Sequence, residues 1–226
     1  MHFITRSHAM SKDQILDSQD SASEYSYEDE NAAHTNEYLW PSVESLLQAL
    51  PSKTVFDLGC GNGAFAKRIA SLGFQVTGVD PSTAGIANAN RSLKSVGLDI
   101  KLFEGSAYDP LSETYGKFPC LVSLEVVEHV YYPRKFARCV FDLLEPNGIA
   151  IISTPFHSYL KNLALALSGK MDSHFTALWD HGHIKFWSVK TLSTLFAEQG
   201  MILEDVKRVG RFPLLAKSMI LIFRKK

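Results

Sequence analysis

The sequence predicts an α/β protein built on a doubly wound, Rossmann-like parallel sheet, and three observations carry this prediction. Short apolar segments alternate with amphipathic ones between residues 54 and 155. A glycine-rich turn containing Gly59, Gly61 and Gly63 follows the first apolar segment. Asp80 ends the second apolar segment, about 20 positions after the glycines. Strand, glycine turn and helix in this rhythm are typical of a parallel sheet with helices on both faces.

The first strands and helices follow from apolar runs and their stop signals. An apolar run bounded by glycine predicts a buried strand over 54–59, and a helix over 64–73 then ends at a glycine. A second strand is expected over 74–80. The next helix, over 82–97, begins at a serine or threonine cap and ends at a glycine. Further strands are expected over 100–105 and 120–125.

The second half of the pattern completes the sheet. A proline in the first turn predicts a helix over 133–144, closed by the turn Glu-Pro-Asn-Gly, and a fifth strand follows over 149–154. A helix over 188–200 and two strands, over 201–209 and 218–225, are expected to end the fold as an edge hairpin.

The N-terminal region divides into two parts. Residues 1–23 are polar and are expected to form a flexible tail, whereas 24–226 are expected to form a single domain. Apolar residues at helical spacing predict a helix over 37–50, which ends before Pro51.

Composition restricts the partners and the compartment. The 226 residues are 46% hydrophobic and carry a net charge of −1, so no overall basic field favours nucleic acid. Three cysteines without metal-type spacing predict reduced thiols in a cytoplasmic protein. Apolar runs fall short of the ~20 residues that a membrane span requires.

The glycine turn is suited to a ligand that approaches the backbone. Glycine tolerates positive φ and has no Cβ, so main-chain N–H groups stay accessible after the strand. Asp80 is placed to accept both hydroxyls of an adenosine ribose. The G-x-G-x-G spacing departs from the dinucleotide fingerprint and argues against an NAD-dependent oxidoreductase, and no P-loop Lys-Ser/Thr follows. The alternative is an ordinary tight turn beside an exposed acid.

Five segments in order resemble the motifs of class I S-adenosylmethionine-dependent methyltransferases: VFDLGCGNG, VTGVDPS, FEGSAYD, LVSLEVVEHV and LEPNGIAIISTP. The resemblance covers residues 54–155. It implies a seven-stranded sheet in the order 3-2-1-4-5-7-6, with strand 7 antiparallel. It also implies that the chain binds S-adenosylmethionine and releases S-adenosylhomocysteine. The cofactor contacts it assigns are Asp57, Gly59, Gly61, Asp80, Pro81, Ser82, Ser106, Ala107, Leu124, Glu125 and Val126.

A second group of polar residues follows the fourth strand. In a helical turn, Glu125, Glu128 and His129 would share one face and could ligate a divalent metal. The alternative is that Glu125 caps a turn near the cofactor while the other two are ordinary helix-start residues. The pattern is similar to that of ubiquinone-biosynthesis O-methyltransferases and of small-RNA 2′-O-methyltransferases. Neutral charge argues against RNA.

The segment 156–185 interrupts the α/β rhythm and is expected to form a lid over the carboxyl edge of the sheet. It contains His157, His174, His181 and His183, of which at least one is expected to act as a base or a ligand. The ubiquinone group carries a T-H-x-x-x-F element near this point, and His183 or His181 stands close to its position. A lid helix with leucines at helical spacing is expected to be buried on the domain. The alternatives are a cap over an apolar substrate or peripheral membrane contact.

These observations together predict methyl transfer to a small-molecule acceptor, at a hydroxyl oxygen of phenol or quinol type. Glu128, His129 and His183 are the candidate catalytic residues. Two alternatives remain: methylation of RNA at the 2′-oxygen, and a methyltransferase-fold binding protein without catalytic activity.

Overall fold

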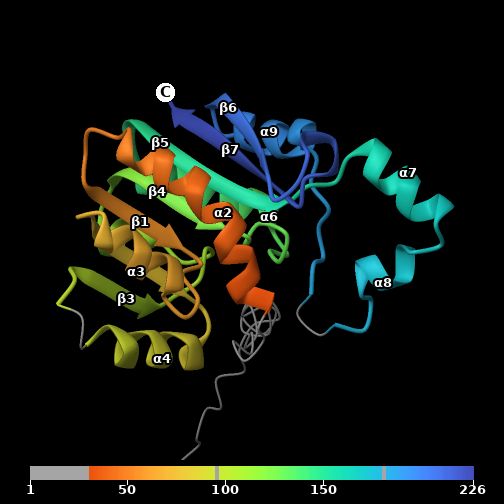
Figure 1. The fold of residues 1–226 in the computed structure, drawn as a ribbon. Coiled ribbons are helices and arrows are strands. Elements are labelled where there is room, and N and C mark those ends of the chain that lie inside the picture. Colours follow the sequence, from red (N-terminus) through yellow and green to blue (C-terminus); the bar gives the residue numbers. More distant parts are fainter. Residues whose placement is uncertain (1–30, 95–96, 180–181) are drawn as a thin grey trace, which may run out of the picture.

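A computed structural model describes residues 31–94, 97–179 and 182–226, and it contains one seven-stranded sheet (Figure 1). The strand order is β3-β2-β1-β4-β5-β7-β6, as the resemblance implied. The strands β1 to β5 are parallel, and β7 runs antiparallel to both β5 and β6. The bounds are β1 Thr54–Leu58, β2 Gln75–Asp80, β3 Ile100–Glu104, β4 Phe118–Leu124, β5 Leu144–Pro155, β6 Met201–Val209 and β7 Ser218–Lys225.

Helices cover both faces of this sheet (Figure 1). One face carries α2 Asn31–Gln48, α3 Ala64–Ser71 and α4 Thr83–Leu93. The other carries α5 Leu111–Tyr115, α6 Pro133–Leu143 and α9 Val189–Ala197. Successive residues of a strand pack on opposite faces of the sheet. Val55 packs with the first set of helices, and Phe56 packs with the second. This is why the parallel strands are apolar at nearly every position.

Several element boundaries differ from the prediction. The N-terminal helix spans 31–48 instead of 37–50, because alanines at 32 and 33 favour helix and extend it backward. The helix expected over 82–97 ends at Leu93, and residues 95–96 lie outside the described part. The short helix α5 was not predicted, because five residues are too few to show a helical period.

The turn expected at 145–148 is part of β5 in the structure. Asn147 has a positive φ of 63°, and the pairing of β4 with β5 shifts register between Phe118 and Cys120. The residues typical of a tight turn are therefore present, but they form an irregularity within the long strand β5.

The insertion after β5 contains α7 Tyr159–Leu167 and α8 Met171–Phe175, which stand to one side of the sheet (Figure 1). The expectation that its main helix is buried was wrong, since α7 has no buried residue and Leu167 is 81% exposed. The reason is that this short helix contacts mainly α8 and the 3₁₀ turn η1 Pro213–Leu215, so most of its leucines have no neighbouring element to pack against.

Two expectations about the chain as a whole are unaffected by the structure. The flexible tail over 1–23 lies outside the described residues, and the single-domain assignment stays a prediction. Within the described part of the chain, no helix combines the length and apolar character needed to cross a membrane.

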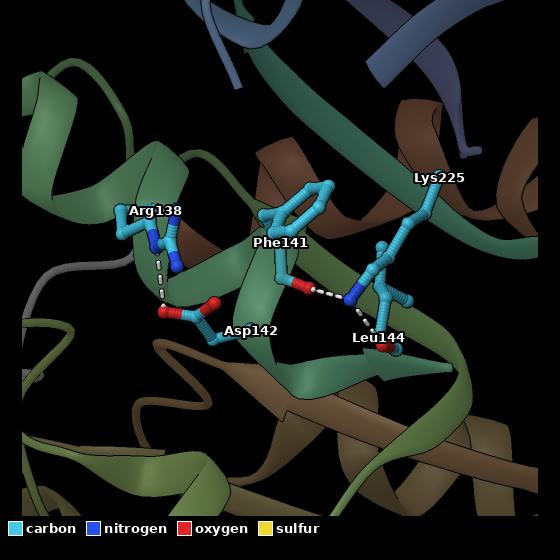
Figure 2. A network of polar contacts seen from close by, with 5 residues as sticks. All are labelled: Arg138, Phe141, Asp142, Leu144 and Lys225. Atoms are coloured by element: carbon cyan, nitrogen blue, oxygen red, sulfur yellow. Dashed lines mark hydrogen bonds and ion pairs between the residues drawn. The ribbon is translucent and has the colours of Figure 1, made fainter. Parts of the chain in front are cut away.

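The last strand is joined to the end of α6 by a buried amine (Figure 2). Lys225 is 7% exposed, and its Nζ donates to the carbonyls of Phe141 and Leu144 at 2.6 and 2.8 Å. These carbonyls lie at the helix end, where intrahelical donors run out. Nearby on the same helix, Arg138 and Asp142 form an exposed ion pair at 2.9 Å. The two interactions differ mainly in burial.

We expect Lys225→Met to lower the free energy of unfolding by about 1–2 kcal/mol, because it removes the donor from two carbonyls near the core. Urea denaturation followed by circular dichroism measures this change. Arg138→Met is the matched control and should change stability by less than about 0.5 kcal/mol, because its ion pair is exposed to solvent. Equal denaturation midpoints for the two variants would contradict the role given to Lys225.

Candidate active site

The turn after β1 is built from glycines in the left-handed region. Gly59, Gly61 and Gly63 have φ values of 84°, 55° and 76°. A Cβ on Gly59 would lie 2.4 Å from Cγ2 of Val126, a distance that no side chain tolerates. The turn therefore needs glycine both for its conformation and for its close approach to the segment after β4.

Asp80 is held rigidly at the end of β2. Its Oδ2 accepts the N–H of Gly61 and its Oδ1 accepts the N–H of Ser82, both at 2.9 Å. Each carboxylate oxygen has further lone pairs, so a ligand hydroxyl can still be accepted. The Ser82 hydroxyl caps α4 by accepting the Gly85 N–H at 3.0 Å, and its own O–H remains available to donate to a ligand.

Asp57 lies on β1 beneath this turn and is 2% exposed. Its Oδ2 has no hydrogen-bond partner in the described residues. Burial, and secondarily the negative charge of Asp80, raises the pKa of Asp57 to about 7. A buried acceptor without a donor is costly, and the amino group that the resemblance assigns to Asp57 would supply one.

The loop after β3 reaches the same edge of the sheet. The N–H of Gly105 donates to the carbonyl of Asp80 at 3.1 Å, and the N–H of Ser106 donates to Asp109 at 2.7 Å. Ala107 packs against the core behind it. Because β2 and β3 are parallel, Pro81 and Ser106 follow neighbouring strand ends. The structure thus brings the residues expected around the nucleoside to one edge.

Glu125 follows Leu124, the last residue of β4, and its carboxylate is bound by serines on β5 and β7. It has a positive φ of 56°. Its Oε1 accepts the hydroxyl of Ser153 at 2.8 Å and its Oε2 accepts that of Ser218 at 3.1 Å. The Ser218 hydroxyl in turn lies 2.9 Å from that of Tyr38 on α2.

Glu125 therefore belongs to a network between β5, β7 and the N-terminal helix, and it is not among the residues whose ligand atoms gather with those of Glu128 and His129. The physical reason is that residues 125–130 form a turn, not the regular helix that would align i, i+3 and i+4 on one face. Burial raises the pKa of Glu125 to about 7, against the opposing effect of its two serine donors.

A different trio gathers at this point: Glu128, His129 and His183 offer ligand atoms that all lie within 4.8 Å of one another. Glu128 is fully buried, and neither of its carboxylate oxygens has a well-formed hydrogen bond among the described residues, although the Thr154 hydroxyl lies near enough to oppose the rise in its pKa. Burial, and secondarily the charge of Glu125, raises the pKa of Glu128 well above its usual range. Such a carboxylate gains most from a proton or a cation.

His183 reaches this trio because the end of the insertion is tied to the turn after β4. The N–H groups of Ile184 and Lys185 both donate to the carbonyl of Glu128 at 3.0 Å, and Trp187 Nε1 donates to that of Val127 at 3.0 Å. Burial, then the charge of neighbouring histidines, lowers the pKa of His183 to about 4. Its imidazole is therefore neutral near pH 7, as a ligand must be.

The remaining details complete the trio. Nδ1 of His129 lies 3.2 Å from the carbonyl oxygen of Gly182, and the rings of His129 and His183 are 4.9 Å apart. His181, the other histidine considered for this position, lies outside the described residues. Sequence reasoning missed the main-chain ties of residues 184 and 185, since backbone hydrogen bonds leave no signal in residue type. Only Trp187, an indole in need of an acceptor, hinted at them.

Comparison with known proteins gives consistent results. A family model described as a methyltransferase domain matches residues 30–205. The ubiquinone biosynthesis O-methyltransferase of Caulobacter vibrioides is 37% identical over 126 residues, which is 56% of this chain and 48% of that protein. The enzyme of the same name from Ruegeria pomeroyi is 31% identical over 157 residues, or 69% and 62% of the two chains. The chain thus spans about half the length of the first of these curated relatives.

Among solved structures, magnesium protoporphyrin IX methyltransferase from Synechocystis PCC 6803, with bound SAH (S-adenosylhomocysteine), has a TM-score of 0.64. The match covers 95% of both chains at 15% identity. At this identity the likeness shows that the two proteins share a fold.

Asp57 provides a test of the site that needs no substrate. In the ligand-free protein the folded state holds a proton on Asp57 up to about pH 7, whereas the unfolded chain loses it near pH 4. The free energy of unfolding of the wild type should therefore fall as pH rises through this window. Asp57→Asn should gain about 2–4 kcal/mol relative to the wild type between pH 4.5 and 8.

Urea denaturation at a series of pH values measures this difference. Asp99→Asn, which changes an exposed aspartate, is the control and should follow the wild-type curve. Parallel curves for Asp57→Asn and the wild type would show that Asp57 is already ionised in the folded protein.

Proposed function

The chain belongs to the class I S-adenosylmethionine-dependent methyltransferases, and from this premise we propose that it methylates a hydroxyl oxygen of a phenol- or quinol-like small molecule. The observation that carries the proposal is the trio of Glu128, His129 and His183 beside the cofactor edge of the sheet. The names of the curated relatives, which are O-methyltransferases of ubiquinone biosynthesis, support the same reaction type.

The cofactor supplies an activated methyl group on a sulfonium, whose S–CH3 bond breaks as the new O–CH3 bond forms. The protein's part is to hold the two reactants in line and to exclude water. Asp80 would accept the ribose hydroxyls, and the unsatisfied Oδ2 of Asp57 would accept the amino group. Gly59 and Gly61 allow the ligand to lie directly on the main chain.

An oxygen acceptor must also lose its proton, because a neutral hydroxyl is a weak nucleophile. We propose that Glu128, His129 and His183 hold a divalent cation, which would lower the pKa of an acceptor hydroxyl. Their chemistry fits such an ion, since one buried carboxylate lacks a well-formed hydrogen bond among the described residues and a neutral imidazole stands beside it. Glu125 has a separate role, since its two oxygens are already bound by serines.

The ribose contact can be tested by cofactor binding. We expect Asp80→Asn to weaken S-adenosylhomocysteine binding by roughly ten- to a hundredfold, because an amide has one acceptor oxygen where the carboxylate has two. Isothermal titration calorimetry measures the dissociation constant. Glu104→Gln is the matched control, because Glu104 lies beside Asp80 on β3 and is exposed. Unchanged affinity in Asp80→Asn would remove the proposed ribose role.

The metal proposal can be tested by direct binding of Mg²⁺ or Mn²⁺. We expect one cation per chain in the wild type and in Glu125→Gln, and none in Glu128→Gln or His183→Ala, because only the latter two remove a ligand. Turnover should vanish in the same two variants and on addition of a chelator, while S-adenosylhomocysteine affinity stays within about twofold. Full turnover of the chelated wild type would refute the metal and leave Glu128 as a candidate base.

A further inference from the structure

A cavity of about 530 Å³ lies between the insertion and the ends of β5 and β7. Its walls come from α7, from α8, from the segment that returns at His183, and from the loop between β6 and β7. His183 also belongs to the trio with Glu128 and His129. The cavity therefore extends from the candidate reaction centre into the insertion, where an acceptor would have to lie.

The polar lining of this cavity is basic. Lys161, Arg211 and Lys217 contribute three cationic residues, of which Lys217 has its amine 5.1 Å from the centre of the Tyr38 ring, and no Asp or Glu is among the residues that line the cavity. This is a local property, because the chain as a whole carries a net charge of −1. Cations gathered without a carboxylate raise the local potential and favour an anion.

Burial and the positive charge in the cavity lower the pKa of basic groups that line it. Lys161 donates to the carbonyl of Phe156 at 2.9 Å, and burial together with the charge of Arg211 lowers the pKa of its amine. Burial and then the charge of Lys161 lower the pKa of His157 to about 4. The Nδ1 atom of His157 is buried without a well-formed hydrogen bond among the described residues, although the Asn162 side chain lies near enough to oppose the fall in the pKa of His157. An anion would relieve the mutual repulsion of these cations.

The rest of the lining is apolar and aromatic. The rings of Phe175 and Phe186 pack edge to face at 5.0 Å, and the imidazole of His157 stacks on Phe175 at 5.9 Å. Leu165 and Leu215 add aliphatic surface. A wall of this kind suits a planar or aliphatic body rather than a second charged group.

We propose that this cavity is the acceptor pocket and that it selects an acceptor with an anionic group, a carboxylate or a phosphate, on an apolar body. Lys161, Arg211 and Lys217 hold the anionic group, and the hydroxyl to be methylated points toward His183. The inference rests on the proposed function and deepens it, because it names the substrate class of the same site.

The test measures binding without turnover, in the presence of S-adenosylhomocysteine. The probes are protocatechuate, which carries a catechol and a carboxylate, its phosphonate analogue, and its neutral amide. We expect calorimetry at low salt to show both anionic probes binding at least about tenfold more tightly than the amide, as expected for a charge-assisted hydrogen bond. The preference should shrink as salt is added.

The variant is the double substitution Arg211→Met and Lys217→Met, which changes two exposed residues. The anionic probes should then bind within about twofold of the amide. The control is Lys101→Met with Lys190→Met, which removes two exposed charges on β3 and α9 and should keep the wild-type preference. Thermal melting confirms that both double variants remain folded.

Three results would overturn the proposal: equal binding of anionic and neutral probes, no binding of any anionic probe at millimolar concentration, or an undiminished preference in the Arg211→Met, Lys217→Met variant. If vesicles of phosphatidylglycerol, but not phosphatidylcholine, bind through Arg211 and Lys217 while the anionic probes do not, the cations serve a lipid surface and the acceptor proposal is wrong. Because these measurements involve no methyl transfer, they can fail while the proposed reaction stands, and the reverse is also true.

Discussion

The close approach of Gly59 to Val126 is the contact on which the arrangement of the site depends. A Cβ at position 59 would stand 2.4 Å from a methyl of Val126, so the turn after β1 and the turn after β4 can meet only as bare main chain against side chain. That contact constrains both the turn after β1 and the segment after β4. It leaves Gly59, Gly61 and Asp80 facing the ligand edge, and it fixes the start of the segment that carries Glu128 and His129. Gly59 therefore fixes how closely the turn after β1 approaches the segment that carries Glu128 and His129.

Glu128 contributes to the site in two ways, through its carbonyl and through its carboxylate. Its carbonyl accepts from Ile184 and Lys185, which holds the returning end of the insertion in place, while its carboxylate remains buried without a well-formed hydrogen bond among the described residues. An unpaired buried carboxylate is expensive, and a fold keeps one only where something else compensates for it. The same residue thus sets the position of His183 and creates the demand for a proton or cation beside it. The position of His183 and the chemistry beside it therefore both depend on Glu128, the first through its main chain and the second through its side chain.

Much of the fold could be predicted because it is expressed in residue type. Apolar runs, stop glycines and Asp80 indicated a doubly wound sheet, and the motifs implied its strand order, which the structure has. The candidate site was predictable only in part. Glu128, His129 and His183, the candidate catalytic residues, lie together in the structure, whereas Glu125, which was grouped with Glu128 and His129 on the assumption of a helical turn, contacts serines instead. Whether residues 125–130 form a turn or a helix is decided by long-range contacts, such as those of Ser153 and Ser218, which no local pattern reveals.

The charge of the cavity shows why an average over the chain is a weak guide to a partner. A net charge of −1 excludes a general basic field, and the expectation against a long polyanion such as RNA, which needs phosphate contacts over a broad surface, stays a prediction. A small anion makes no such demand, because salt screens charges that lie more than about one Debye length away. Only cations close to the anion then attract it. Three cations from α7 and the β6–β7 loop satisfy that local requirement. These residues come together only through the way the insertion folds beside the strand ends, so the proposed preference for an anionic acceptor rests on the tertiary structure and not on the composition.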